Sequence, residues 1–256
     1  MSASSRHVSI LRLLVLVIVT GVWWGVARVA DSRFIPTPLE TLDAGARMIS
    51  TGVLQKALGQ SLLVFLSGYL LATVIAIPVG LLMGGFRILG RTLEVYVNAL
   101  AATPRVAFIP LIILLLGLDA EAKIAIIFLG AVMPILINTY AGVAVSDDEL
   151  VEMARSAGAG RMAIFFKIML PGAIPFVLAG LRLGAAIGLI NTIVAEVYTA
   201  VSGLGGLLSV YGNTFQMAPY FVVVLVLALI GGLVTYLIRV LEHRMGRWRG
   251  SVANFR

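Results

Sequence analysis

The sequence predicts an all-α integral membrane protein with about six transmembrane helices. Hydrophobic residues make up 60% of the 256 residues and charged residues only 12%, whereas a soluble domain carries about 25% charged residues. The mean hydropathy is +1.05. The charged residues lie mostly between long apolar runs, and a helix needs roughly 20 such residues to cross a bilayer. Because no internal repeat divides the chain, we expect a single transmembrane domain over residues 1–256.

The two most clearly defined spans lie in runs that carry no charged side chain, residues 57–86 and 124–146. Uncharged runs of this length are typical of membrane-spanning helices. The remaining runs contain or border a few charged or helix-breaking residues. Together the expected spans are residues 8–30, 58–86, 93–118, 124–146, 175–200 and 219–239.

The first run also fits a second interpretation, a cleaved signal peptide. Arg6 and Arg12 precede its apolar region, as basic residues do in a signal peptide. A cleavage site after Ala30 would place Arg28 at the minus-three position, where signal peptides have a small residue. We therefore favour a retained span.

Two later runs depart from a simple apolar helix. The third span contains "TPRVAFIP" (103–110), and each of its two prolines removes a backbone donor from a helix. Residues 197–238 carry no charge but are too many for one helix. The glycines of "SGLGG" (202–206) and Pro219 divide this run, which leaves the sixth span after them.

The distribution of basic residues predicts the orientation. Six spans place both termini on one side, and 12 basic residues fall on that side against five on the other, with Arg105 and Arg182 left out as intramembrane. Since cytoplasmic loops carry the excess of lysine and arginine, we expect both termini in the cytoplasm. The basic segment "EHRMGRWRG" (242–250) is then a juxtamembrane anchor for anionic lipid, and not a nucleic-acid patch.

One cytoplasmic connection, residues 147–171, has the pattern of two short amphipathic helices. Ser146 and Glu149 form a capping box at its start. "GAG" (158–160) breaks the helix because glycine adopts the dihedrals of a sharp turn, and Pro171 ends the second helix. Such an element either rests on lipid headgroups or docks in a groove of a cytoplasmic partner. Periodicity leaves both interpretations open.

The spacing inside this connection resembles the EAA loop of ABC-importer permease subunits. The pattern of that loop is E-A-A, three residues, G, nine residues, I-x-L-P. Here Met153 replaces the first alanine, and the positions that match are Glu152, Ala154, Gly158, Ile168, Leu170 and Pro171. The stretches "FIPTPLETL" (34–42), 103–143 and 180–208 also resemble permeases of the sulfonate, taurine and nitrate type.

The resemblance implies a type I ABC importer-like fold in the bacterial inner membrane. It implies a permease subunit that forms the solute pathway and couples to a separate ATPase through residues 147–170. The implied partners are two copies of the ABC ATPase subunit, a second permease copy in a homodimer, membrane lipid and an extracytoplasmic solute-binding protein, with no nucleic acid. The coupling residues implied are Glu152, Ala154, Arg155, Gly158, Ile168, Leu170 and Pro171.

The resemblance further implies that the chain is not an enzyme and holds no cofactor, because the partner ATPase binds ATP and Mg. In agreement, the sequence has no G-x-x-x-x-G-K-[ST] phosphate loop. The implied substrate is a small anionic or heteroaromatic nutrient such as a sulfonate, nitrate or a vitamin precursor.

Four polar residues inside the expected spans are candidates for the solute pathway, because such residues are costly in a bilayer and are often functional. They are Arg105, Asn138, Asn191 and Glu196. Each also has a structural interpretation: Arg105 as a clamp on freed carbonyls of a broken helix, Glu196 as a partner of a helix end, and the asparagines as helix–helix contacts.

Three glycines at four-residue spacing, Gly180, Gly184 and Gly188, predict close helix packing of the fifth span, in the bundle interior or at a dimer contact.

A different function class stays open as the alternative, a stand-alone secondary transporter or channel driven by an ion gradient. Glu196 and Arg105 would supply its paired intramembrane charges. An intramembrane enzyme has no support, because His7 and His243 lie near the termini and there is no cysteine.

Overall fold

The computed structural model describes residues 3–29, 34–145, 148–199 and 202–246, and the regular structure in these ranges is helical throughout. The helices are α1 (Ala3–Val29), α2 (Pro38–Ser50), α3 (Val53–Gly85), α4 (Arg87–Ala102), α5 (Ile109–Leu116), α6 (Ala120–Ala144), α7 (Asp148–Ser156), α8 (Arg161–Ile164), α9 (Leu170–Thr199), α10 (Gly203–Asn213) and α11 (Met217–Gly246). A 3₁₀ turn (Arg105–Phe108) precedes α5, and a π-helical turn (Phe165–Met169) joins α8 to α9. The predicted all-α membrane fold is confirmed.

Five helical stretches in the described ranges are long and apolar enough to cross a membrane. They are Ile10–Val29, Val53–Gly85, Ala120–Ala144, Arg161–Thr199 and Met217–Val240. A sixth crossing exists if α4 and α5 are taken together, although these two helices meet at 78°. The expected capping box at Ser146 and the basic residues from 247 onward lie outside the described residues.

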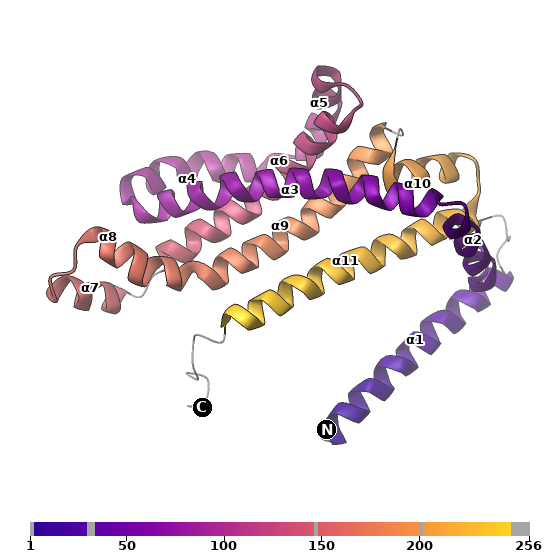
Figure 1. Ribbon diagram of the computed structural model, residues 1–256, viewed down its shortest axis with the longest axis horizontal. Helices are drawn as coiled ribbons and strands as arrows, with labels where there is room; N and C mark the ends of the chain where they lie inside the picture. Colours follow the sequence, from indigo (N-terminus) through magenta and orange to yellow (C-terminus); the bar gives the residue numbers. More distant parts are fainter. Residues whose placement is uncertain (1–2, 30–33, 146–147, 200–201, 247–256) are drawn as a thin grey trace.

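Helix α6 forms the centre of the bundle, with α3 packed along one side and α9 along the other (Figure 1). The glycines of the fifth span allow α9 to pack closely against α6. A Cβ on Gly180 would lie 2.8 Å from the Asn138 Cβ, and a Cβ on Gly184 would lie 2.6 Å from the Ile135 Cγ1. A Cβ on Gly188 would lie 3.3 Å from the Phe65 Cε2 of α3. The three glycines therefore pack inside this subunit.

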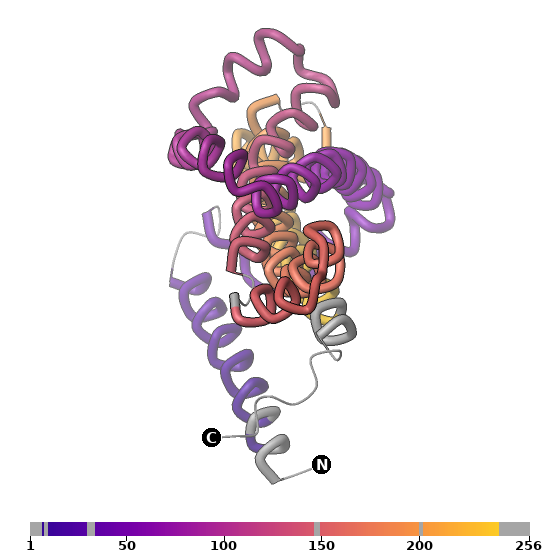
Figure 2. The backbone as a smooth tube through the Cα atoms, turned by 90° about the vertical axis from the view of Figure 1, so that its left-hand side faces the viewer, coloured from indigo at the N-terminus to yellow at the C-terminus, as the bar shows by residue number. Residues whose placement is uncertain are grey.

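Helices α1 and α5 stand away from this bundle (Figures 1 and 2). Most of their side chains are exposed, including Leu13 at 68% on α1 and Leu114 at 80% on α5. Because these surfaces are apolar, they are suited to contact with lipid or with other transmembrane helices.

The structure differs from the sequence-based expectation at the start of the fifth span. Pro171 was expected to end a short helix there, but residues 161–199 form one continuous helical stretch. Pro171 lacks the N–H that would bond the Lys167 carbonyl, and its ring crowds that carbonyl in a regular helix. The π-helical turn Phe165–Met169 widens the helix at this point, which accommodates the proline without a break.

The third expected span, residues 93–118, is also different, because it is divided into α4 and α5. Pro104 disfavours the helical conformation at the residue before it, and Thr103 accordingly has ψ 132°. α4 begins at Arg87, directly after α3. Helices α2 and α10 were not anticipated as separate elements, and both lie at the end of the molecule opposite α7 and α8 (Figure 1).

Candidate functional site

Helices α7 and α8 form an elbow at one end of the molecule (Figure 1). Gly158 lies at the turn with φ +81°, a left-handed conformation that glycine adopts without steric cost. The Ala159 N–H donates to the Ala154 carbonyl and the Gly158 N–H donates to the Arg155 carbonyl, both at 2.9 Å. This pair of bonds is a Schellman motif, which satisfies the last carbonyls of α7. Gly158 thus sets the angle between the two helices.

The tip of the elbow is exposed, whereas its base is anchored. Met153 is 64% exposed and Met162 is 66% exposed, and Glu152 and Arg155 are exposed beside them. At the base, Phe165 packs on the end of α3, where a Cβ on Gly85 would lie 2.8 Å from its ring. Large exposed apolar side chains next to charged ones are typical of a surface that another protein covers.

The remaining residues of the predicted coupling motif lie on α7 and beyond the Phe165 anchor. Ala154 is half-buried on the inner side of α7. Ile168 and Leu170 are half-buried, and Pro171 is exposed at the beginning of α9. The seven motif residues therefore extend from the exposed elbow, which carries Glu152, Arg155 and Gly158, to the beginning of α9.

Arg105 lies at the break between α4 and α5 and bonds two backbone carbonyls. Its Nη1 donates to the Gly130 carbonyl at 3.0 Å and its Nη2 to the Ala101 carbonyl at 3.3 Å. The Gly130 carbonyl is free because the residue four positions later in α6 is Pro134, which has no N–H. Arg105 thereby supplies the donor that Pro134 cannot give to the Gly130 carbonyl, and it links the end of α4 to α6.

The two candidate asparagines have different surroundings. Asn191 lies against Gly130, where a Cβ would overlap its side-chain amide, so it is close to the carbonyl that Arg105 bonds. Asn138 donates its Nδ2 hydrogen to the Pro134 carbonyl of its own helix at 2.8 Å. Arg105 and Asn191 thus meet at Gly130, and Asn138 lies two turns away along α6.

Glu196 is separate from these residues and completely buried, with an exposed fraction of 0%. The Ser61 hydroxyl of α3 donates to its two carboxylate oxygens at 2.8 and 2.9 Å. The Gly205 N–H donates to Oε2 at 2.8 Å, and the Leu204 N–H donates to the Ser61 Oγ at 2.8 Å. The Gly203 N–H donates to the Gln60 Oε1 at 3.2 Å. Gln60, Ser61 and Glu196 therefore satisfy the N–H groups of the first three residues of α10, where a negative charge is favoured.

Glycine is required at the start of α10 because Glu196 is so close. A Cβ on Gly203 would overlap the Glu196 carboxylate, and a Cβ on Gly205 would lie 2.6 Å from the Glu196 Cβ. The "SGLGG" stretch, which the sequence suggested as a divider between spans, is thus the capped N-terminus of a short helix.

The sequence analysis did not identify two members of this polar cluster, Ser61 and Lys123. Lys123 is only 3% exposed, and its Nζ donates to the Ser202 Oγ at 2.8 Å. Its position in the first turn of α6, directly before a long apolar run, was the available signal. Within the described residues there is no group of three or more His, Asp or Glu side chains placed to hold a metal ion.

The model of the family described as "Binding-protein-dependent transport system inner membrane component" matches residues 76–247. The taurine transport system permease protein TauC of Escherichia coli (strain K12) is 29% identical over 255 residues, covering 97% of this chain and 92% of TauC. SsuC of Bacillus subtilis (strain 168), a permease protein assigned to aliphatic sulfonates transport, is 30% identical over 241 residues, covering 93% of this chain and 87% of SsuC.

Among solved structures, a chain of the MetNI methionine ABC transporter in an inward-facing conformation has a TM-score of 0.65. It is 20% identical and covers 75% of this chain and 95% of its own length, which shows a shared fold. The resemblance to permeases of the sulfonate and taurine type is confirmed, and the chain belongs to the family of inner membrane components of binding-protein-dependent transport systems.

Proposed function

We propose that this chain forms the solute pathway of an ATP-driven importer and couples it to a separate ATPase subunit through residues 147–170. The observation that carries this proposal is the elbow of α7 and α8. Its tip exposes Met153 and Met162 together with Glu152 and Arg155, and its base is fixed to the bundle. Rigid helices with an exposed apolar and charged tip suit insertion into a groove of another protein.

The ATPase is a different chain in this proposal, and it binds ATP and Mg. The sequence carries no phosphate-binding loop of the G-x-x-x-x-G-K-[ST] type, so the permease itself is non-catalytic. Two permease copies form a homodimer with two ATPase subunits. The exposed apolar surfaces of α1 and α5 support such pairing, because each offers a contact surface within the membrane.

Both termini lie in the cytoplasm in this arrangement, as does the elbow. The support is the excess of basic residues on that side. The opposite end of the molecule, with α2 and α10, then faces outward, where a solute-binding protein delivers the substrate.

The substrate proposed is a small anion of the sulfonate class. The taurine and aliphatic sulfonates relatives support this class, because their similarity covers nearly the whole chain. Arg105 and Asn191, which meet at Gly130, are the residues proposed to face the solute, since a half-buried guanidinium attracts an anion. Asn138 and Glu196 complete the candidate pathway, with Glu196 acting through the position of α10.

The test is gentle purification of the tagged chain from native membranes, followed by mass spectrometry of the proteins that accompany it. Recovery of an ATPase subunit and a solute-binding protein supports the proposal. If the chain is recovered alone while a known importer complex survives the same procedure, the coupling role is contradicted. Uptake driven by a proton or sodium gradient would then favour the stand-alone transporter.

A further inference from the structure

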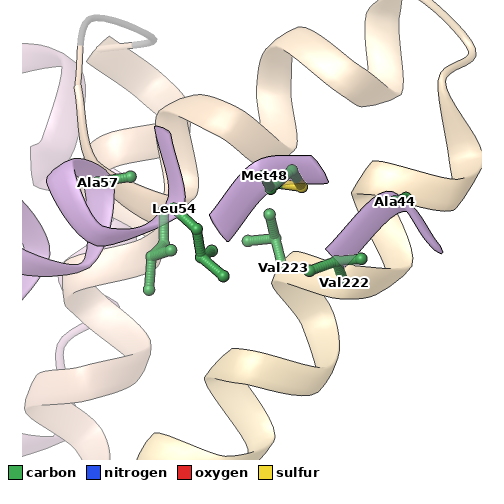
Figure 3. Close-up of a cluster of buried hydrophobic side chains, with 7 residues drawn as sticks. Ala44, Met48, Leu54, Ala57, Val222 and Val223 are labelled. Atoms are coloured by element: carbon green, nitrogen blue, oxygen red, sulfur yellow. The ribbon is translucent and has the colours of Figure 1, made fainter. Parts of the chain in front are cut away.

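Helix α2 presents three different faces to its surroundings. With 3.6 residues per turn, one face packs on α11 and α3, a second is apolar and exposed, and a third is charged. Figure 3 shows the packed face, where Ala44 and Met48 lie against Val222 and Val223. The exposed apolar face consists of Leu39 (56%), Leu42 (68%) and Ile49 (55%). The charged face consists of Glu40, Asp43 and Arg47, all exposed.

These faces orient α2 at the membrane surface. The apolar face gains free energy by contact with lipid, whereas the charged face must remain in water. Glu40, Asp43 and Arg47 therefore face the aqueous phase at the end of the molecule that is opposite the α7–α8 elbow (Figure 1).

The charged face of α2 forms one wall of a cleft with a volume of about 350 Å³. Phe215, in the turn between α10 and α11, forms the other wall with Met217 and Ala218 at the start of α11, and Pro36 also lines the cleft. We call this feature the outer cleft. It contains two carboxylates and one guanidinium, which gives it a net negative charge.

The first wall is held in place by hydrogen bonds. The Thr37 N–H donates to the Glu40 Oε2 at 2.7 Å, and the Thr37 hydroxyl bonds the same oxygen at 3.0 Å. The bond from the Thr37 backbone N–H, followed by that from its hydroxyl, lowers the pKa of Glu40, so this group remains ionised. Beside it, the Trp23 Nε1–H donates to the Pro36 carbonyl at 3.1 Å. The outer cleft is therefore preformed.

Phe215 on the second wall has an unusual backbone conformation. It has φ +55° and is the one residue other than glycine with a positive φ in the described part of the chain. Its side chain is 65% exposed. Its ring contacts the Phe34 ring edge-on, with 6.2 Å between the ring centroids. A bulky residue in this conformation is strained, and the mostly exposed ring recovers little of that strain through burial. An aromatic side chain kept at such a position indicates a contact surface.

We propose that the outer cleft is a docking surface for the solute-binding protein, and that a lysine or arginine side chain of that protein occupies it. This inference rests on the proposed function, which supplies both the partner and the outward orientation. The cation lies between Glu40 and Asp43, and its aliphatic stem lies along Phe215 and Met217. The two carboxylates outnumber the single guanidinium of Arg47, so the net charge of the cleft disfavours an anionic solute or an anionic lipid headgroup and favours a cationic protein side chain.

The test uses the permease–ATPase complex in lipid nanodiscs, titrated with its purified solute-binding protein while ATP hydrolysis is measured. Asp43→Asn and Glu40→Gln should each raise the half-saturating concentration of binding protein by roughly three- to tenfold, because each removes one attraction at an interface. The maximal rate should stay the same. The effect should diminish at high salt, where charges are screened.

Glu121→Gln is the matched control for these variants. Glu121 is also acidic and exposed, and it lies two positions before Lys123, which bonds Ser202 at the start of α10. It is thus at the same end of the molecule but outside the cleft. A higher half-saturating concentration of binding protein for Asp43→Asn and Glu40→Gln, with no change for Glu121→Gln, supports docking at the cleft.

Phe215→Gly separates docking from folding. Glycine relieves the backbone strain at φ +55°, so the thermal midpoint should stay the same or rise, while the half-saturating concentration rises. Unchanged half-saturation for Asp43→Asn, Glu40→Gln and Phe215→Gly overturns the docking proposal alone, provided that the wild-type complex hydrolyses ATP. If no ATPase assembles with the wild-type chain, the proposed function fails and the docking proposal fails with it.

Discussion

The hydroxyl of Ser61 donates a hydrogen bond to the carboxylate of Glu196, which is 135 residues further along the chain. The same hydroxyl oxygen accepts the N–H of Leu204, and the carboxylate accepts the N–H of Gly205. Two side chains from α3 and α9 thereby cap α10, and both are buried, with exposed fractions of 4% for Ser61 and 0% for Glu196. In a membrane protein an unsatisfied N–H is costly, so this pair determines where α10 lies.

Ser61→Ala should destabilise the protein by about 1–3 kcal/mol, because it leaves the Leu204 N–H and part of the Glu196 carboxylate without a partner. The measurement is the thermal midpoint of the purified protein in detergent. Ser67→Ala is the control, since the Ser67 hydroxyl is exposed on the same helix and bonds only the Leu63 carbonyl of its own turn. Equal midpoints for the two variants would argue against the capping role.

Gly205→Ala should destabilise the protein by about 1–3 kcal/mol through overpacking. A Cβ there would lie 2.6 Å from both the Glu196 Cβ and the Ile193 carbonyl oxygen, and neither atom is the end of a flexible chain. Gly59→Ala, on α3, has nothing within 4 Å of the added carbon and should be neutral or slightly stabilising. An unchanged thermal midpoint for Gly205→Ala would show that α10 can shift away from Glu196 without loss of stability.

Arg105 and Pro134 should show energetic coupling. Arg105→Ala leaves the Gly130 carbonyl without a donor, whereas Pro134→Ala restores the N–H that normally bonds it. We therefore expect Pro134→Ala to recover part of the stability lost in Arg105→Ala, with an interaction energy of about 1 kcal/mol. The double-mutant cycle is measured by thermal unfolding, and additive effects would mean that the arginine does not act through this carbonyl.

The same variants separate structure from transport. If Arg105 also faces the solute, the double variant should regain stability but not uptake. Recovery of both would assign Arg105 a structural role only.

Gly158→Asp should abolish recovery of the ATPase with the permease while leaving membrane insertion intact. Gly158 has φ +81°, and a side chain there strains the turn that sets the elbow even though nothing crowds the position. Gly160→Ala is the control, because Gly160 has φ −72° and also lies in open space. Normal ATPase recovery with Gly158→Asp would contradict the coupling assignment.

Much of the fold follows from patterns that the sequence displays locally. Long apolar runs predict the spanning helices, and the glycines at 158–160 predict the elbow, because each of these features acts within a few turns of chain. Pro171 shows the limit of such reasoning. A proline is expected to end a helix, yet the π-helical turn before Pro171 lets the helix continue. No local sequence pattern predicts that turn.

The polar contacts needed the structure because they join distant residues. Glu196 was recognised as an intramembrane charge, but its partner Ser61 looks like any serine in an apolar run. Lys123 precedes a long apolar run in the sequence, and only the structure shows that its ammonium lies beside Ser202. Arg105 was expected to bond freed carbonyls near its own prolines, and it does bond the Ala101 carbonyl at the end of α4. Its second partner, the carbonyl that Pro134 frees in α6, was not foreseen because it lies on a different helix.

The central claim is that the chain imports solute only when a partner ATPase hydrolyses ATP. The most direct measurement is uptake of a radiolabelled sulfonate such as taurine into proteoliposomes containing the purified permease–ATPase complex and its solute-binding protein. The predicted result is uptake that requires internal ATP and the binding protein and that persists without any ion gradient. Gly158→Asp should abolish this uptake. Uptake by the permease alone, driven by a proton or sodium gradient, would contradict the account.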